Sequence, residues 1–167
     1  MAYKFQKKTI SKVGVVSSGQ IGPDIALHFS KVISPQDSTI VVVDISQQAL
    51  DAGRARLDKK VDRGIKGGAF KPDAGAKMKD AVTFSTDYEL LRDADLIIEA
   101  ASENKTIKQK IFAQLEDLCR EDTIIASNSS HMEPEVIAEP LEKRGRSLVI
   151  HYFFPAERNP IVEVVPG

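Results

Sequence analysis

Three short polar segments in the C-terminal half of the chain carry side chains that could do chemistry. They are Glu99–Asn104, Ser127–Ser130 and His151–Pro155, and each directly follows a run of consecutive apolar residues. Imidazole, with an unperturbed pKa of about 6.5, can take up and return a proton near neutral pH, which makes the histidine of the third segment a candidate acid–base group. If the apolar runs are parallel strands of one sheet, these segments meet in a crevice beyond the strands' carboxyl ends.

A fourth segment, near the N-terminus, matches a dinucleotide-binding signature. It is G-x-G-x-x-G with serine in the first glycine position, and it lies between an apolar run and a helical pattern. The glycines of this signature permit a tight turn, close approach of the pyrophosphate and close packing of helix on sheet. The helix N-terminus presents free N–H groups to the phosphates. The predicted cofactor-binding residues are therefore Ser17, Ser18, Gly19, Gln20, Ile21 and Gly22.

An acidic residue stands where the signature places the acid that binds the adenosine ribose. Asp44 follows the apolar run Ile40–Val43, roughly twenty residues after Gly22, and Ile45–Gln47 contains no cation to hold a 2′-phosphate. This pattern predicts NAD rather than NADP as the cofactor. The alternative is a glycine turn in some other βαβ protein, with Asp44 capping a helix.

The elements that position these segments can be predicted from the apolar pattern. Short runs rich in β-branched residues are apolar at consecutive positions, which indicates strands buried on both faces. These runs are Val13–Val16, Ile40–Val43, Leu96–Ile98, Ile124–Ala126 and Leu148–Ile150, with Thr83–Ser85 as a probable edge strand. Apolar residues at helical spacing separate them: Ile21, Ile25, Phe29 and Val32; Ile107, Ile111, Leu115 and Leu118; and a charged helix at Ala49–Lys66.

Strands that alternate with helices predict an α/β fold. We expect a Rossmann-type, doubly wound and mostly parallel sheet with helices on both faces. Residues 11–167 would form this domain, after an N-terminal extension at residues 1–10.

Composition narrows the classes of function. The formal net charge of −1, from 23 basic and 24 acidic residues, gives no electrostatic reason to expect nucleic acid or a membrane surface as a partner. Cys119 is the only cysteine, so no internal disulfide forms and no metal site is expected. The N-terminus lacks the apolar core of a secretory signal, and no apolar run is long enough for a membrane span, so we expect a cytoplasmic protein.

Taken together, the motifs resemble those of the 3-hydroxyacyl-CoA dehydrogenase family, over about residues 10–167. That family has a glycine loop, an acid that ends the second strand, and then E-A-x-x-E-N, S-N-T-S-S, H-F-F-N-P and L-V-E-V-V. Here the last four appear in the same order at Glu99–Asn104, Ser127–His131, His151–Pro155 and Ile161–Val165. Several motifs in order, at matching separations, make a far more specific signal than any one of them.

The resemblance implies roles for individual residues. His151 matches the catalytic histidine, Glu163 the carboxylate that orients it, and Ser130 the serine that hydrogen-bonds the substrate's 3-oxygen beside the cofactor. Glu103 and Lys108 match polar residues on the cofactor side. A carboxylate on one imidazole nitrogen fixes the tautomer and stabilises the imidazolium that forms when the other nitrogen takes a proton.

Candidate substrate-binding residues are less distinctive. Lys60, Lys66 and Asn128 are predicted to contact the acyl-CoA, the two lysines because basic groups in that segment line the CoA phosphates in the family. A solvated helix face is an equally good interpretation of the basic residues. His131 replaces a serine of the family and is interpreted as a surface residue or a new substrate contact.

The implied activity is NAD-dependent oxidation of a (3S)-3-hydroxyacyl-CoA to the 3-oxoacyl-CoA, as in fatty-acid degradation. The family continues into a helical domain, which this sequence lacks, so we expect an isolated cofactor-binding domain with little activity of its own, and a homo-oligomer formed through the missing domain. Two departures, Ser17 in the glycine loop and Phe154 for the asparagine of H-F-F-N-P, keep alternatives open. These are a non-catalytic nucleotide-binding or assembly module, and a dehydrogenase for a cyclic or branched hydroxyacyl-CoA.

Overall fold

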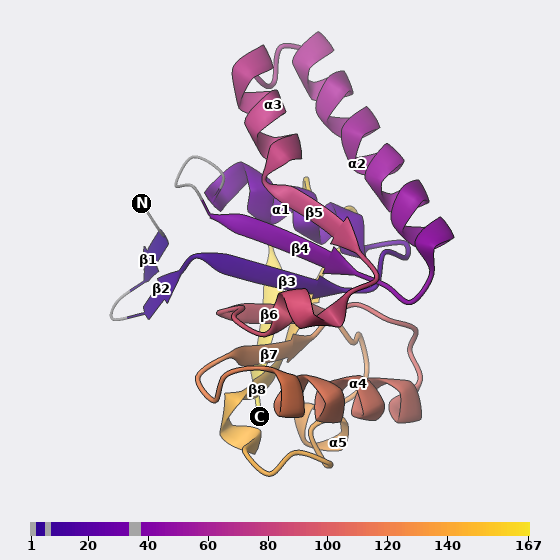
Figure 1. The fold of residues 1–167 in the computed structure, drawn as a ribbon, viewed down its shortest axis with the longest axis vertical. Helices are drawn as coiled ribbons and strands as arrows, with labels where there is room; N and C mark the ends of the chain where they lie inside the picture. The colour runs from indigo at the N-terminus through magenta and orange to yellow at the C-terminus, as the bar shows by residue number, and fades with distance from the viewer. Residues whose placement is uncertain (1–2, 6–7, 34–37) are drawn as a thin grey trace.

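Seven strands form one sheet at the centre of the computed structural model, which describes residues 3–5, 8–33 and 38–167 (Figure 1). Their order is β5-β4-β3-β6-β7-β8-β9, and every neighbouring pair is parallel except β8 and β9. The strands are β3 (Lys12–Val16), β4 (Thr39–Val43), β5 (Val82–Ser85), β6 (Leu96–Glu99), β7 (Ile124–Ser127), β8 (Ser147–Tyr152) and β9 (Val162–Pro166). The predicted doubly wound, mostly parallel sheet is confirmed, and β5 lies at its edge.

Helices cover both faces of this sheet. They are α1 (Gly22–Ile33), α2 (Gln47–Lys66), α3 (Pro72–Asp80), α4 (Lys105–Leu118) and α5 (Pro134–Ile137), with short 3-10 turns η2 (Tyr88–Leu91) and η3 (Arg144–Arg146). α2 and α3 lie side by side and extend past β5 (Figure 1). No helix in the described ranges has both the length and the apolar character that crossing a membrane requires.

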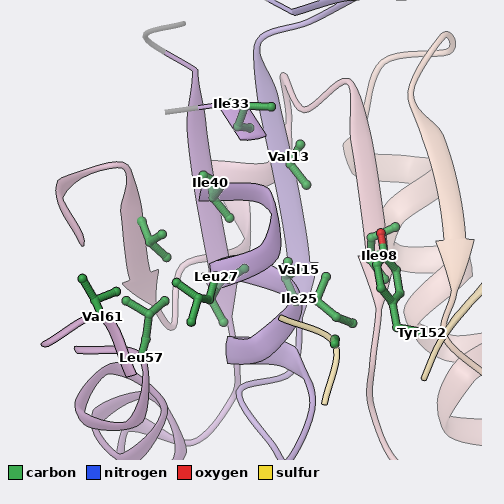
Figure 2. Packing of buried hydrophobic residues seen from close by; sticks show 14 of the residues in the cluster. Val13, Val15, Ile25, Leu27, Ile33, Ile40, Leu57, Val61, Ile98 and Tyr152 are labelled. Carbon is green, nitrogen blue, oxygen red and sulfur yellow. The ribbon is translucent and has the colours of Figure 1, made fainter. Parts of the chain in front are cut away.

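Consecutive apolar residues in the strands fill two separate cores. Val13 and Val15 of β3 pack with α1 and α2, as Figure 2 shows, whereas Val16 packs on the opposite face with α4. Gly14 faces that second core, where a Cβ atom would lie 2.7 Å from the Leu91 side chain. The lack of polar alternation in the sequence therefore reflects burial on both sides of the sheet.

The order in which the strands are added to the sheet switches from one side of β3 to the other, where β6 pairs parallel with β3. The units β3–α1–β4 and α2–α3–β5 extend one way from β3, and β6, β7 and β8 extend the other way. Such a switch point leaves a crevice beyond the carboxyl ends of the two central strands. The glycine loop follows β3 and the segment Glu99–Asn104 spans the end of β6, so both border this crevice.

Two short strands precede the main sheet. β1 (Tyr3–Phe5) and β2 (Lys8–Ile10) pair antiparallel, outside the main sheet. The boundary predicted at residue 10 coincides with the end of β2, and β3 begins at Lys12. Residues 1, 2, 6 and 7 of the predicted extension lie outside the described part of the chain.

Candidate active site

A cleft of about 650 Å³ opens at the switch point. Residues from four loops line it, each loop at the carboxyl end of a different strand. They are Ser17, Gly19, Gln20 and Ile21 after β3; Ala100, Ala101, Ser102 and Glu103 after β6, with Lys108 of α4; Asn128 and Ser130 after β7; and His151, Tyr152, Phe153 and Phe154 at the end of β8. The predicted convergence of the polar segments is present in the structure.

The glycine loop turns through a backbone conformation that serine rarely adopts. Ser17 has φ of 91°, and its hydroxyl accepts a hydrogen bond from the Gly19 N–H at 3.2 Å. Gly22 lies so close to this turn that a Cβ atom there would be 1.9 Å from the Ser17 carbonyl oxygen. The third glycine of the signature is therefore required by close packing of α1 against the loop.

Asp44 ties the loop to the end of β4. Its carboxylate accepts hydrogen bonds from the Ser18 N–H at 2.8 Å and the Ser46 N–H at 2.9 Å. The side chain of Ser18 points away from the cleft and donates to the Ala49 carbonyl at 2.9 Å. Ser18, a predicted cofactor residue, thus contributes to loop shape, and Gly22 likewise acts through packing rather than by lining the cleft.

A second cleft, of about 440 Å³, lies on the other side of the loop. Its lining includes Asp44, Ile45, Tyr88, Ile107 and Ile111, and it shares Ser17, Ala101 and Ser102 with the first cleft. Two adjoining clefts on either side of a glycine loop, one of them with a carboxylate, suit the two halves of a dinucleotide. The residues present therefore fit NAD, with Asp44 at the adenosine ribose and the loop at the pyrophosphate.

Lys108, which lines the first cleft, belongs to a buried ion pair. The Lys108 ammonium lies 3.0 Å from both carboxylate oxygens of Glu99, and both side chains are almost fully buried, at 1% and 0% exposed. Glu99 also accepts hydrogen bonds from the Ser127 hydroxyl and the Ala101 N–H, both at 2.6 Å. Because each charge is paired and hydrogen-bonded, the pair joins β6, β7 and α4 without leaving a bare charge.

Glu103 connects this ion pair to the predicted substrate serine. One of its oxygens lies 3.1 Å from the Lys108 ammonium, and the other accepts from the Ser130 N–H at 2.7 Å and the Ser130 hydroxyl at 3.2 Å. Burial alone would raise the pKa of Glu103, but these donors, with the Ser129 hydroxyl, outweigh it and hold the pKa below its ordinary value. Glu103 is therefore an acceptor that fixes Ser130 at the edge of the cleft.

His131 does not line the cleft, but it lies beside Ser130 and Glu103. Its Nδ1 lies 3.4 Å from the Ser130 hydroxyl oxygen and 3.6 Å from a Glu103 carboxylate oxygen. The side chain is largely exposed. His131 is interpreted from the sequence as either a surface residue or a new substrate contact. Its exposed position matches the first interpretation, and it borders Ser130, the predicted substrate serine.

His151 and Glu163 face each other across β8 and β9, which pair antiparallel. The strand register sets His151 of β8 opposite Glu163 of β9, so both side chains are on the same face. The His151 Nδ1 lies 3.5 Å from a Glu163 carboxylate oxygen, with side chains 19% and 59% exposed. The histidine and the carboxylate expected from the resemblance thus face each other, and His151 and Ser130 both line the cleft.

Of the three predicted substrate residues, one lines the cleft and two do not. Asn128 lines the cleft, and its side-chain oxygen accepts from the Tyr152 N–H at 2.8 Å. Lys60 lies away from it and is paired with Asp24 at 2.7 Å and Glu157 at 2.8 Å. Lys66 is exposed at the end of α2 and lines none of the clefts described in this structure.

The sequence does not predict two features of the site, the burial of Glu99 and the contact of Arg56 with the glycine loop. Glu99 was noted only as part of a motif, and its burial opposite Lys108 could have been suspected from an acid at a strand end followed by a lysine on the next helix. Arg56 of α2 donates to the Gly19 carbonyl and so supports the glycine loop from behind. No sequence signal distinguishes Arg56 from the other basic residues of α2.

Comparison with known proteins agrees with this geometry. The protein-family model described as the NAD-binding domain of 3-hydroxyacyl-CoA dehydrogenase matches residues 12–167. The glyoxysomal fatty acid beta-oxidation multifunctional protein of Brassica napus is 32% identical over 158 residues, which cover 95% of this chain and 21% of that protein.

Solved structures give the same result. The (S)-3-hydroxybutyryl-CoA dehydrogenase of Ralstonia eutropha superposes with a TM-score of 0.88 at 33% identity, covering 95% of this chain and 54% of that one. The 3-hydroxybutyryl-CoA dehydrogenase of Escherichia coli K12 gives 0.87 at 28% identity, covering 93% of this chain and 32% of that one. The chain belongs to the family of NAD-binding domains of 3-hydroxyacyl-CoA dehydrogenases. It spans about a fifth of the multifunctional protein and a third to a half of the two dehydrogenases.

Proposed function

We propose that this domain serves the NAD-dependent oxidation of a (3S)-3-hydroxyacyl-CoA to the 3-oxoacyl-CoA. The observation that carries the proposal is the meeting of His151, paired with Glu163, and Ser130 in the cleft that the glycine loop borders. A secondary alcohol held there would have a proton acceptor and a hydroxyl partner beside the cofactor. The similar multifunctional protein and dehydrogenases support the same reaction class.

The residues divide the work of the reaction. Bound NAD supplies the acceptor for the hydride that leaves C3. With Nδ1 facing the Glu163 carboxylate at 3.5 Å, the other ring nitrogen of His151 takes the hydroxyl proton as the C–O bond becomes a carbonyl. Ser130, fixed by Glu103, orients the 3-oxygen, and the Glu163 carboxylate stabilises the positive charge that His151 gains. In the reverse direction the same nitrogen returns the proton.

A basic groove outside the cleft suits the nucleotide end of coenzyme A. The groove holds about 430 Å³ between α1, the end of α2 and the segment after β8, and Lys31, Lys60, Arg63, Phe70 and Arg158 are among its lining residues. Lys60 is already paired with two carboxylates, so we assign Lys60 a supporting part and the phosphate contacts to Arg63 and Arg158. Lys66 lies beyond this lining.

The test compares two single substitutions in the complete protein expressed from its own gene. We expect His151→Gln to lower the kcat for acetoacetyl-CoA reduction by NADH at least a thousandfold while NADH affinity changes little, because the histidine moves the proton and does not hold the dinucleotide. We expect Asp44→Ala to weaken NADH binding about tenfold, measured by calorimetry.

Retention of full turnover by the His151→Gln protein would refute the assignment. Absence of NADH binding at millimolar concentration in the wild-type protein would favour the non-catalytic module instead. The protein's oligomeric state and its compartment stay predictions.

A further inference from the structure

We propose that the two phenylalanines in the cleft lining select thioesters whose substituent on C3 is bulky and apolar rather than a methyl group. This inference rests on the proposed function, since it concerns what the same site accepts. It assigns Phe154, with Phe153 beside it, as the specificity-determining residues.

Both phenylalanines are presented to the cleft rather than to the core. Phe153 is 40% exposed and Phe154 is 62% exposed, and both line the cleft next to His151. The Phe153 ring lies 4.7 Å from the His151 ring, between centroids, at an angle of 56°. The carbon that carries the reacting oxygen must lie within reach of His151, so its neighbouring substituent meets these rings.

The lining of the cleft combines two chemistries. The glycine loop and the side chains of Glu103, Lys108 and Ser130 supply polar groups, whereas the Phe153 and Phe154 side chains offer no hydrogen-bond donor or acceptor. A ligand that suits this lining is polar where it meets the cofactor-side residues and apolar where it meets the two rings.

The segment that carries these rings is anchored from below. Ala156 is buried, and the Glu157 carboxylate lies 2.8 Å from the Lys60 ammonium of α2. Lys31 of α1 donates to the Glu157 backbone carbonyl, and the Arg158 N–H donates to the Pro155 carbonyl at 3.0 Å. Because the turn is fixed to both helices, the aromatic wall is preformed and costs little ordering when a substrate binds.

Burial explains the direction of selectivity. Removing apolar surface from water contributes roughly 25 cal/mol per Å², and aromatic side chains bring 150–250 Å² each in general. A methyl group covers little of an exposed ring, whereas a phenyl group or an alkyl chain covers much of it. The gain is made beside the reacting carbon, where it counts toward kcat/KM.

The test measures relative kcat/KM for three 3-oxoacyl thioesters with NADH in the complete protein. The substrates are acetoacetyl-CoA, 3-oxodecanoyl-CoA and 3-oxo-3-phenylpropanoyl-CoA. We expect wild-type protein to favour the two bulky substrates, and Phe154→Asn to lower their kcat/KM relative to that of acetoacetyl-CoA about tenfold. Phe154→Leu, which keeps an apolar side chain, should retain most of the preference.

Ile161→Asn is the matched control, because Ile161 is also an exposed apolar residue, at 64%, but does not line the cleft. It should leave the substrate ratios unchanged. Two results would overturn this inference alone. One is a preference of the wild-type protein for acetoacetyl-CoA, and the other is an equal loss of kcat/KM on all three substrates in the Phe154→Asn protein. Wild-type protein that binds NADH but turns over none of the three thioesters would overturn the proposed function as well.

Discussion

Ser17 occupies a position where the backbone favours glycine. Its φ of 91° lies in the left-handed region, which generally costs a residue with a side chain about 1–3 kcal/mol. The hydrogen bond from the Gly19 N–H to the Ser17 hydroxyl offsets part of this cost. The serine therefore keeps the turn of the signature at some expense in stability.

We predict that Ser17→Gly raises the free energy of unfolding by about 1 kcal/mol, since glycine adopts this φ freely. Urea denaturation measures the change. Ser17→Ala is the control: it removes the hydroxyl but keeps the strain, and should be destabilising. If the glycine and alanine variants were equally stable, backbone strain at this position would not be the cause.

Residue types in the site could be predicted where a motif demanded them. His151, Glu163, Ser130 and Asp44 lie where the order of the motifs placed them. The direction of a side chain could not be predicted, because it depends on partners far along the chain. Lys60 shows this, since Glu157 binds it from a segment 97 residues away.

At the scale of the element, α4 shows how a buried charge shifts a helical face. The apolar spacing predicted a stripe through Ile107 and Ile111, yet Ile107 is 42% exposed and faces the second cleft. Leu115 of the predicted stripe is buried, and the other buried residues of α4 are Phe112 and Lys108. A pattern of apolar residues cannot reveal this, because a lysine counts as polar until its partner, Glu99, is known.

We predict that Lys108→Met lowers the free energy of unfolding by about 3 kcal/mol, because it leaves the Glu99 charge buried without its cation. Lys105→Met is the matched control on the same helix: Lys105 pairs with Glu139 at 3.0 Å, but both side chains are more than half exposed. That change should cost less than about 1 kcal/mol. Equal losses in the two variants, in urea denaturation, would contradict the role given to burial.

In the whole molecule, the alternation of strands and helices with right-handed crossovers predicts a mostly parallel sheet covered by helices, so the fold class could be predicted before any contact was known. The antiparallel return of β9 beside β8 could not, because periodicity does not encode direction. That return matters for the site, since it sets Glu163 opposite His151. The proposed catalytic pair is thus a property of sheet topology rather than of local sequence.

The cofactor clefts join two halves of one sheet, and ligand binding should show it. Ser17 belongs to the half built on β3, while Ala101 and Ser102 follow β6 in the other half, and all three line both clefts. We predict that NADH slows backbone hydrogen exchange in Ser17–Gly22 and Glu99–Asn104 together, because a ligand at 100 times its Kd stabilises the bound fold by about 2.7 kcal/mol.

NADPH at the same concentration should protect both segments much less, since its 2′-phosphate would meet the Asp44 carboxylate with no lysine or arginine in Ile45–Gln47 to offset the repulsion. Hydrogen-exchange mass spectrometry measures both segments at once. Protection confined to one half of the sheet would contradict a dinucleotide spanning the switch point, and equal protection by NADPH would contradict the part assigned to Asp44.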